Sequence, residues 1–138
     1  MDTLDSETGQ VSINYESDII IARRMAREIA TTLGFGVTDI TRIVTVVSEL
    51  ARNIFLYAGS GMMSWRVLKS NNKSGLELIF EDHGPGIPNI NMVLQGGHSS
   101  GNGLGLGLKG AKTLMDEMQI KTQIGIGTEI VIKKWRRE

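Results

Sequence analysis

Two short stretches organise this chain: Asp-His-Gly-Pro-Gly-Ile-Pro at residues 82–88 and Gly-Leu-Gly-Leu-Gly-Leu-Lys-Gly at residues 103–110. Both prolines and a cluster of the glycines lie here, whereas the flanking sequence has clear hydrophobic periodicity. Glycine permits backbone conformations closed to other residues and lets a ligand approach the main chain closely. A helical pattern follows at once, and the free N–H groups of a helix N-terminus attract phosphate. The pattern predicts a nucleotide pocket with a flexible cover.

Composition narrows the possible classes of protein. The chain has 138 residues, 41% of them hydrophobic, and no cysteine, which favours one domain and excludes disulfides and thiolate metal sites. Fifteen acidic residues balance fifteen basic ones, which argues against a nucleic-acid partner. The N-terminus lacks a signal-peptide core, and no apolar run approaches the roughly 20 residues that span a bilayer. We therefore expect a cytoplasmic protein that does not enter membranes.

Periodicity predicts one strand and two helices in the first part of the chain. Residues 1–9 are expected to be frayed, and residues 11–15 alternate as a strand does. Helices are expected over residues 17–33 and 38–57. The positions expected to face the core are Ile20, Ile21, Met25, Ile29 and Leu33 in the first helix, and Ile40, Ile43, Val47, Leu50 and Ile54 in the second.

The remaining elements complete an α+β pattern. They are strands at 62–67 and 76–81 around a turn at 71–75, a helix at about 108–116, and strands near 118–124 and 128–135. The order β-α-α-β-β-loop-α-β-β predicts a two-layer sandwich, in which a mixed sheet carries its helices on one face. The basic run at residues 133–137 is interpreted as a solvated strand end rather than as a binding patch.

Glu49 and Asn53 are the first candidates for chemistry. They lie four residues apart in the second expected helix, so they share one stripe beside the apolar one. A carboxylate can orient or deprotonate a nucleophile, and an amide oxygen is a suitable ligand for Mg²⁺. Taken alone, the pair also fits two solvated polar side chains.

Asp82 is the second candidate. It has the parity of Leu78 and Phe80, so alternation sends its carboxylate toward the buried face, where it needs hydrogen-bond donors. A base with an exocyclic amino group would supply one, and Gly84 and Gly86 would let the ring approach. Alternatively, the strand ends before Asp82, which then only opens a turn.

The second glycine stretch is the third candidate. Gly105, Gly107 and Gly110 formally match the dinucleotide-binding fingerprint, but that motif needs a strand immediately before it, and residues 95–103 read as a loop. A plain connector is the simpler interpretation. It does not explain why the glycines precede a helix start with Lys109 and Lys112, whose charges can meet phosphate.

Four motifs in this order resemble one superfamily. Residues 49–53 (Glu-Leu-Ala-Arg-Asn), 82–86 and 103–107 resemble the N, G1 and G2 boxes of the GHKL ATPase/kinase superfamily, and residues 127–129 are similar to its threonine element. Within it, three stretches look most like the RsbT-type switch serine/threonine kinases of bacterial stressosomes, namely residues 48–54, 57–59 and 114–117. The RsbW and SpoIIAB anti-sigma kinases are more distant likenesses.

The resemblance implies one ATP-binding kinase domain of the Bergerat fold over residues 1–138. Asn53 would coordinate Mg²⁺, and Glu49 would act as general base or orient the attacking hydroxyl. Asp82 would accept a hydrogen bond from the adenine amino group, supported by Thr128 directly or through water.

The resemblance also implies an ATP lid at about residues 94–107. In it Gly103, Gly105 and Gly107 would present N–H groups to phosphate, while Gly84 and Gly86 would shape the floor under adenine. Asn102 stands where the anti-sigma relatives often have an arginine. The cation for the γ-phosphate is thus open among Lys109, Lys112 and Arg52.

The implied function is that of an ATP-dependent serine/threonine kinase. Kinases of the RsbT type phosphorylate STAS-domain proteins of the stressosome and, when released, activate a phosphatase. The competing class is a nucleotide-binding module, similar to an anti-sigma factor, that binds partners without significant turnover. The intact Glu49 favours the kinase.

Overall fold

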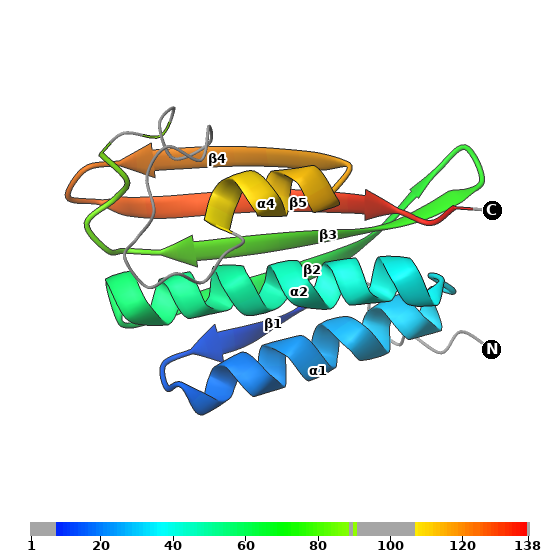
Figure 1. Ribbon diagram of the computed structural model, residues 1–138, viewed down its shortest axis with the longest axis horizontal. Coiled ribbons are helices and arrows are strands. Elements are labelled where there is room, and N and C mark those ends of the chain that lie inside the picture. Colours follow the sequence, from blue (N-terminus) through cyan, green and yellow to red (C-terminus); the bar gives the residue numbers. More distant parts are fainter. Residues whose placement is uncertain (1–7, 89, 91–106, 138) are drawn as a thin grey trace.

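The computed structural model of the protein describes residues 8–88, 90 and 107–137, so predictions about residues 1–7 and 91–106 lie outside it. The sheet order is β1-β2-β3-β5-β4, and the helices cover one face of the sheet (Figure 1). The predicted two-layer α+β architecture is confirmed. The described elements are β1 (Thr8–Ile13), α1 (Ser17–Thr32), α2 (Val37–Asn53), η1 (Ile54–Ala58), β2 (Gly61–Ser70), β3 (Lys73–Asp82), α4 (Gly107–Leu114), β4 (Glu117–Gln123) and β5 (Gly127–Trp135).

The prediction of a mixed sheet is wrong, because every pairing between the described strands is antiparallel. Strands β3 and β4 do run in the same direction, since both are antiparallel to β5. However, β5 folds back from β4 and lies between the two. The connection through α4 therefore makes β3 and β4 parallel, but these two strands are not neighbours in the sheet.

Strand β1 begins earlier than predicted. Thr8 and Gly9 pair with Arg66 and Trp65 of β2, so residues 8 and 9 are not frayed, and residues 14–15 lie beyond the strand. A glycine at position 9 reads as a break in a strand. Here it has a packing role, because a Cβ at residue 9 would collide with the indole ring of Trp65.

The hairpin between β2 and β3 is tighter than the predicted five-residue turn. Only Asn71 and Asn72 separate the strands, and both have positive φ, 53° and 68°. Two positive φ angles are the conformation that two-residue hairpins require, and asparagine tolerates it better than most residues.

The connection from β1 to α1 is held by Asp18. Its carboxylate accepts hydrogen bonds from the backbone N–H groups of Asn14 at 2.8 Å and Tyr15 at 2.9 Å. These bonds lower the pKa of Asp18 below its ordinary 3.8. The contact therefore stabilises the fold above that pH, and this contribution is lost as the pH falls through the lowered pKa.

Helix α1 buries a different stripe from the predicted one. Ile29 is buried as expected, but Ile20 and Ile21 are 54% and 43% exposed. The prediction was based on the large apolar side chains, whereas three of the five residues that the helix buries are alanines. Its buried residues are Ile19, Ala22, Ala26, Ile29 and Ala30.

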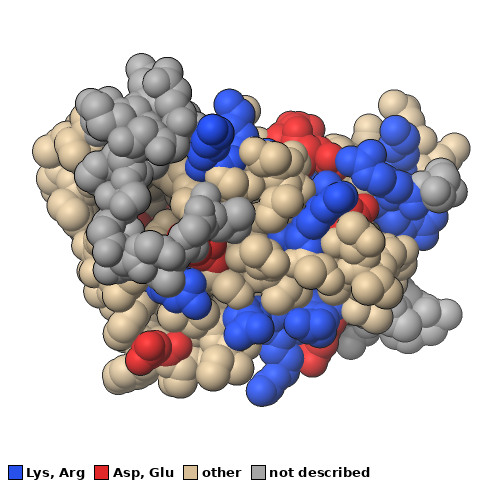
Figure 2. Space-filling view, in the orientation of Figure 1, with Lys and Arg blue, Asp and Glu red and all other residues tan. Residues whose placement is uncertain are grey.

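The outer side of α1 is basic. Arg23, Arg24 and Arg27 are exposed there, and Lys and Arg side chains gather over this helix (Figure 2).

None of the described helices, α1 included, is long and apolar enough to cross a membrane.

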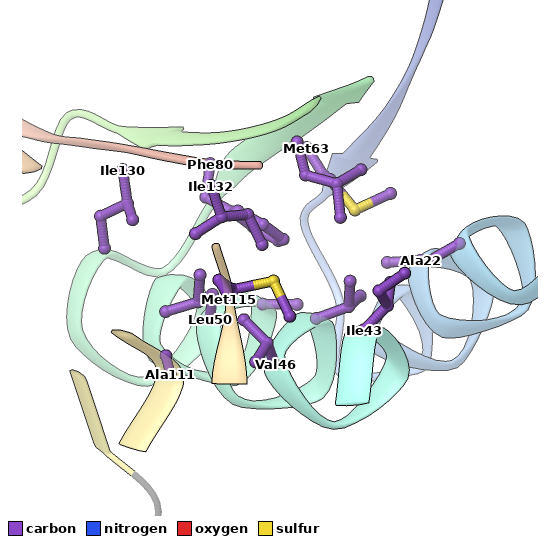
Figure 3. Packing of buried hydrophobic residues seen from close by; sticks show 14 of the residues in the cluster. Ala22, Ile43, Val46, Leu50, Met63, Phe80, Ala111, Met115, Ile130 and Ile132 are labelled. Carbon is purple, nitrogen blue, oxygen red and sulfur yellow. The ribbon is translucent and has the colours of Figure 1, made fainter. Parts of the chain in front are cut away.

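Helix α2 follows its predicted stripe closely. Ile43, Val47, Leu50 and Ile54 are at most 3% exposed, and Ile40 is half-buried. These side chains pack on the inner rungs of the sheet, where Phe80 of β3 lies between Met63 of β2 and Ile130 of β5 (Figure 3). The core therefore lies between α2 and the middle of the sheet.

Candidate nucleotide-binding site

At one end of the sheet, three polar side chains lie in a row across neighbouring strands on the helix-covered face. This row, called the polar rung here, consists of Asp82, Thr128 and Thr122. Asp82, the last residue of β3, pairs with Thr128 of β5, and Thr128 pairs in turn with Thr122 of β4. Directly paired residues share a face, and Asp82 lies two residues beyond the buried Phe80. All three polar side chains therefore lie on the helix side, as alternation predicted for Asp82.

The alternative prediction, that Asp82 opens a turn, also holds in part. Its Oδ1 accepts a hydrogen bond from the backbone N–H of Gly84 at 2.8 Å. An ionised carboxylate has two oxygens with about four acceptor positions, so this one bond leaves capacity for a further donor. The turn therefore orients the half-buried carboxylate without saturating it.

Thr122 is a member of this rung that the sequence reasoning missed. Its hydroxyl lies 2.9 Å from that of Thr128, and it accepts a hydrogen bond from the backbone N–H of Ile87 at 2.8 Å. It therefore ties the turn after Asp82 to the β4–β5 hairpin. The available signal was its position opposite Thr128 across the predicted hairpin, which becomes informative only once the register is known.

Gly84 and Gly86 let this turn pack closely between two elements. A Cβ on Gly84 would lie 2.7 Å from the Cβ of Ala58 in η1. A Cβ on Gly86 would lie 2.6 Å from the carbonyl oxygen of Gln123, and Gly86 has a φ of +83°. The turn is thus in contact with η1 on one side and β4 on the other.

We expect Gly86→Ala to lower the free energy of unfolding by about 3 kcal/mol. About 1–2 kcal/mol comes from the positive φ and a similar amount from the collision with β4. The matched control is Gly125→Ala, because Gly125 has a φ of +79° and a Cβ there would meet nothing within 4 Å. Urea denaturation of both variants measures the difference. Equal losses would show that the contact with β4 does not constrain residue 86.

Glu49 and Asn53 lie at the C-terminal end of α2. Glu49 is 6% exposed, and its Oε1 is 3.7 Å from a guanidinium nitrogen of Arg52. Asn53 is half-buried and ends the regular helix. The chain continues in the π turn η1, closed by a hydrogen bond of 3.0 Å from the N–H of Gly59 to the carbonyl of Ile54. Single π turns inside helices are frequent at functional sites.

The structure brings the helix of Glu49 and Asn53 to the end of the sheet where Asp82 lies. The link is the contact of η1 with Gly84, two residues after Asp82. The end of β3, the end of α2 and the β4–β5 turn all lie at one end of the molecule (Figure 1). The two halves of the predicted site therefore belong to one region.

Helix α4 lies over the middle of β5, and its first residue is the part of the helix nearer to this end of the molecule (Figure 1). Its first residue, Gly107, has a φ of +60°, and Lys109 and Lys112 are exposed along it. The helix predicted at about 108–116 is confirmed within two residues. Gly103 and Gly105, like most of the predicted lid at 94–107, lie outside the described residues.

Comparison with known proteins identifies a family and several relatives. The family model of the histidine kinase-, DNA gyrase B- and HSP90-like ATPases matches residues 38–138. The serine/threonine-protein kinase RsbT of Bacillus subtilis (strain 168) is 50% identical over 127 residues, which cover 92% of this chain and 96% of that protein. An anti-sigma F factor of Clostridium kluyveri is 31% identical over 70% of this chain and 70% of its own length.

A solved structure agrees with the fold. The structure of the RsbU and RsbW domains of a Mycobacterium tuberculosis protein matches with a TM-score of 0.64 at 16% identity, over 94% of this chain and 33% of that one. This likeness supports the fold alone.

The family and the enzyme class follow from these relationships. Half of the aligned residues are shared with a serine/threonine-protein kinase over nearly the full length of both chains, so this chain is an enzyme of that class. The family match over residues 38–138 contains the Asn53, Asp82 and Thr128 motifs and implies the use of ATP. The chain therefore belongs to the family of histidine kinase-, DNA gyrase B- and HSP90-like ATPases.

Proposed function

We propose that this kinase phosphorylates STAS-domain proteins of a stressosome-like complex with ATP, and then changes partner to activate a downstream phosphatase. One structural observation carries the nucleotide-binding part. The helix that bears Glu49 and Asn53 continues into η1, which packs on the turn after Asp82. The identity of 50% to RsbT supports the partner classes.

Adenine is proposed to bind at the polar rung. Within the part of the chain that the structure describes, the Asp82 carboxylate accepts one backbone hydrogen bond. Its other acceptor positions suit the exocyclic amino group of adenine, which would supply the donor that a half-buried carboxylate needs. Thr128 would support this contact directly or through water. Gly84 and Gly86 would form the floor under adenine. Because neither has a side chain, the turn that contains them packs directly against η1 and β4, and these contacts would hold the floor in place.

Asn53 is proposed as the protein ligand of Mg²⁺. Its amide oxygen is a hard donor, and one or two protein oxygens are enough because Mg²⁺ usually keeps waters and substrate phosphates as its other ligands. The bound ion would offset charge on the phosphate oxygens. Gly103, Gly105 and Gly107 are proposed to present N–H groups to the same phosphates.

Glu49 is proposed to orient or deprotonate the hydroxyl of the substrate serine or threonine. Its burial in α2 limits its rotamers, so that the carboxylate is held in place before the substrate arrives. The proposed candidates for the γ-phosphate are Lys109 and Lys112, which are exposed along α4, and Arg52, which lies 3.7 Å from Glu49.

The test is phosphoryl transfer to a purified STAS-domain protein from ATP labelled at the γ-phosphate. We expect label on a serine or threonine of the STAS protein, and none when that residue is replaced by alanine. The alternative function is a nucleotide-binding interaction module, which the likeness to anti-sigma F factors favours. Tight binding of ATP and the STAS protein without transfer of label would support the module and contradict the proposed substrate.

A further inference from the structure

Lys134 is a charged residue at a core position. Alternation along β5 places Thr128, Ile130, Ile132 and Lys134 on the helix-covered face, and Lys134 is only 4% exposed. The interpretation of residues 133–137 as a solvated strand end is therefore wrong for this lysine. Burying an ion costs several kcal/mol unless it is well paired, and apolar residues in place of buried ion pairs are often as stable. Stability alone does not explain a lysine here.

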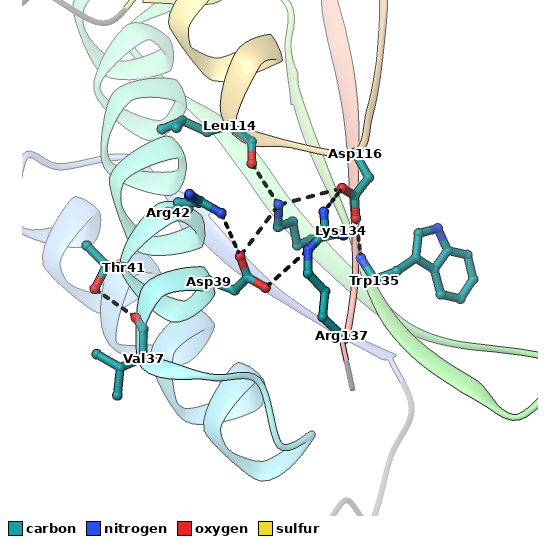
Figure 4. A network of polar contacts seen from close by, with 9 residues as sticks. All are labelled: Val37, Asp39, Thr41, Arg42, Leu114, Asp116, Lys134, Trp135 and Arg137. Carbon is teal, nitrogen blue, oxygen red and sulfur yellow. Dashed lines mark hydrogen bonds and ion pairs between the residues drawn. The ribbon is translucent and has the colours of Figure 1, made fainter.

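The ammonium group of Lys134 joins three elements (Figure 4). It donates a hydrogen bond of 3.0 Å to the carbonyl oxygen of Leu114, the last residue of α4. It also lies 3.7 Å from Oδ1 of Asp39 in the first turn of α2 and 3.6 Å from Oδ1 of Asp116. The last carbonyls of a helix have no partner within it, and a positive charge is favourable there. Lys134 therefore caps α4 and fixes its end to β5 and α2.

Asp116, two residues after α4, strengthens the same junction. Its Oδ2 accepts a hydrogen bond of 2.7 Å from the backbone N–H of Trp135, and its Oδ1 accepts one of 2.9 Å from Arg137. The first half of α4 contributes Leu108 to the core. These polar contacts fix the position of α4 along its helix axis. Apolar contacts alone would fix that position less precisely.

Strand β5 and helix α4 run side by side and are joined where Lys134 contacts Leu114. Thr128 and Lys134 are six residues apart, which is about 20 Å along a strand. Helix α4 runs beside β5 in the same direction (Figure 1), and its eight residues span about 12 Å. A short helix fixed at its C-terminal carbonyl moves as a rigid body. Its first turn, with Gly107 and Lys109, is therefore placed relative to Thr128 by the contact at Leu114.

We propose that Lys134 is a positioning residue that sets the spacing between the adenine end and the phosphate end of the nucleotide site. This role rests on the proposed function, in which Asp82 and Thr128 hold adenine and the start of α4 meets phosphate. Lys134 touches neither end. It acts through the last carbonyl of α4.

The test compares two ligands that share adenine and differ in phosphate. In Lys134→Met, an apolar side chain of similar length, we expect the dissociation constant of ATP to rise about tenfold or more, the effect of losing one hydrogen bond to a charged phosphate. The dissociation constant of adenosine should remain within about twofold, because Asp82 and Thr128 are retained. Calorimetry measures ATP binding, and NMR titration measures the weaker binding of adenosine.

The matched control is Lys133→Met. Lys133 lies on the opposite face of β5, where its ammonium group is 3.8 Å from both Glu77 and Glu117, so this variant loses the same charge beside the junction. We expect both ligands to bind it as they bind the parent. If Lys134→Met does not fold, the double variant Lys134→Met/Asp39→Asn also neutralises the buried carboxylate that has lost one of its three cationic partners, the others being Arg42 and Arg137. The same split between ligands is expected.

Two results would overturn the positioning role: an unchanged affinity for ATP in a folded Lys134 variant, or an equal loss for ATP and adenosine. The second result would indicate general damage to the fold. A parent protein that binds neither ligand would instead contradict the nucleotide site itself, and the role of Lys134 with it.

Discussion

We expect Glu49→Gln to lower the rate of phosphoryl transfer to a STAS-domain protein by about two to four orders of magnitude, while the affinity for ATP should remain within a few-fold of the parent. This is the range that a positioned acid–base group contributes. Glutamine keeps the size of a side chain that is 6% exposed, so the variant leaves no cavity. It also removes the ion pair with Arg52, but at 3.7 Å and with Arg52 38% exposed that pair contributes little to stability.

Single-turnover transfer of labelled phosphate measures this effect, with calorimetry for ATP affinity. The matched control is Glu28→Gln, because Glu28 is exposed on α1, and its transfer rate should equal that of the parent. A parental rate in Glu49→Gln would remove Glu49 from the mechanism. A loss of ATP affinity equal to the loss of rate would assign Glu49 to nucleotide binding instead.

The parts of the fold that were predicted correctly depend on local patterns. The stripe of α2 recurs every three or four residues, and four of its five members are fully buried. The turn between β4 and β5, predicted at 125–127, lies at 124–126, and α4, predicted from about 108, starts at Gly107. Both were located within one residue because the backbone freedom of glycine is visible in the sequence itself. Asp82 was placed on the correct face because alternation in β3 continues to its last residue.

The parts that were missed depend on contacts between distant residues. Thr122 becomes part of the site only through its register with Thr128, and register is not visible in a single strand. Ile20 and Ile21 of α1 are exposed because alanines allow closer packing, a preference set by the neighbouring elements. In the sequence, Lys134 is one residue of a basic run. Only the structure shows that it is buried and contacts the last residue of α4. Sequence patterns locate the chemical groups, whereas the fold decides which groups support them.

Asp82→Asn should reduce the affinity for ATP by about ten- to a hundredfold. A hydrogen bond to a charged group contributes about 1.5–3 kcal/mol, and each 1.4 kcal/mol is a factor of ten in affinity. The structure adds a directional reason. The oxygen of the asparagine would still accept the N–H of Gly84, so its NH₂ group would face the nucleotide. That group and the exocyclic amino group of adenine are both donors.

The same geometry predicts a change of base preference that distinguishes a site for adenine from a merely structural aspartate. Inosine triphosphate has a carbonyl oxygen where ATP has the amino group. We therefore expect it to bind Asp82→Asn more tightly than ATP does, and we expect the parent to prefer ATP. Calorimetry with both nucleotides measures the ratio. Glu81→Gln is the control, since Glu81 lies on the opposite face of β3 and is exposed, and its ratio should equal that of the parent. A ratio that Asp82→Asn leaves unchanged would mean that the carboxylate orients the turn and does not bind the base.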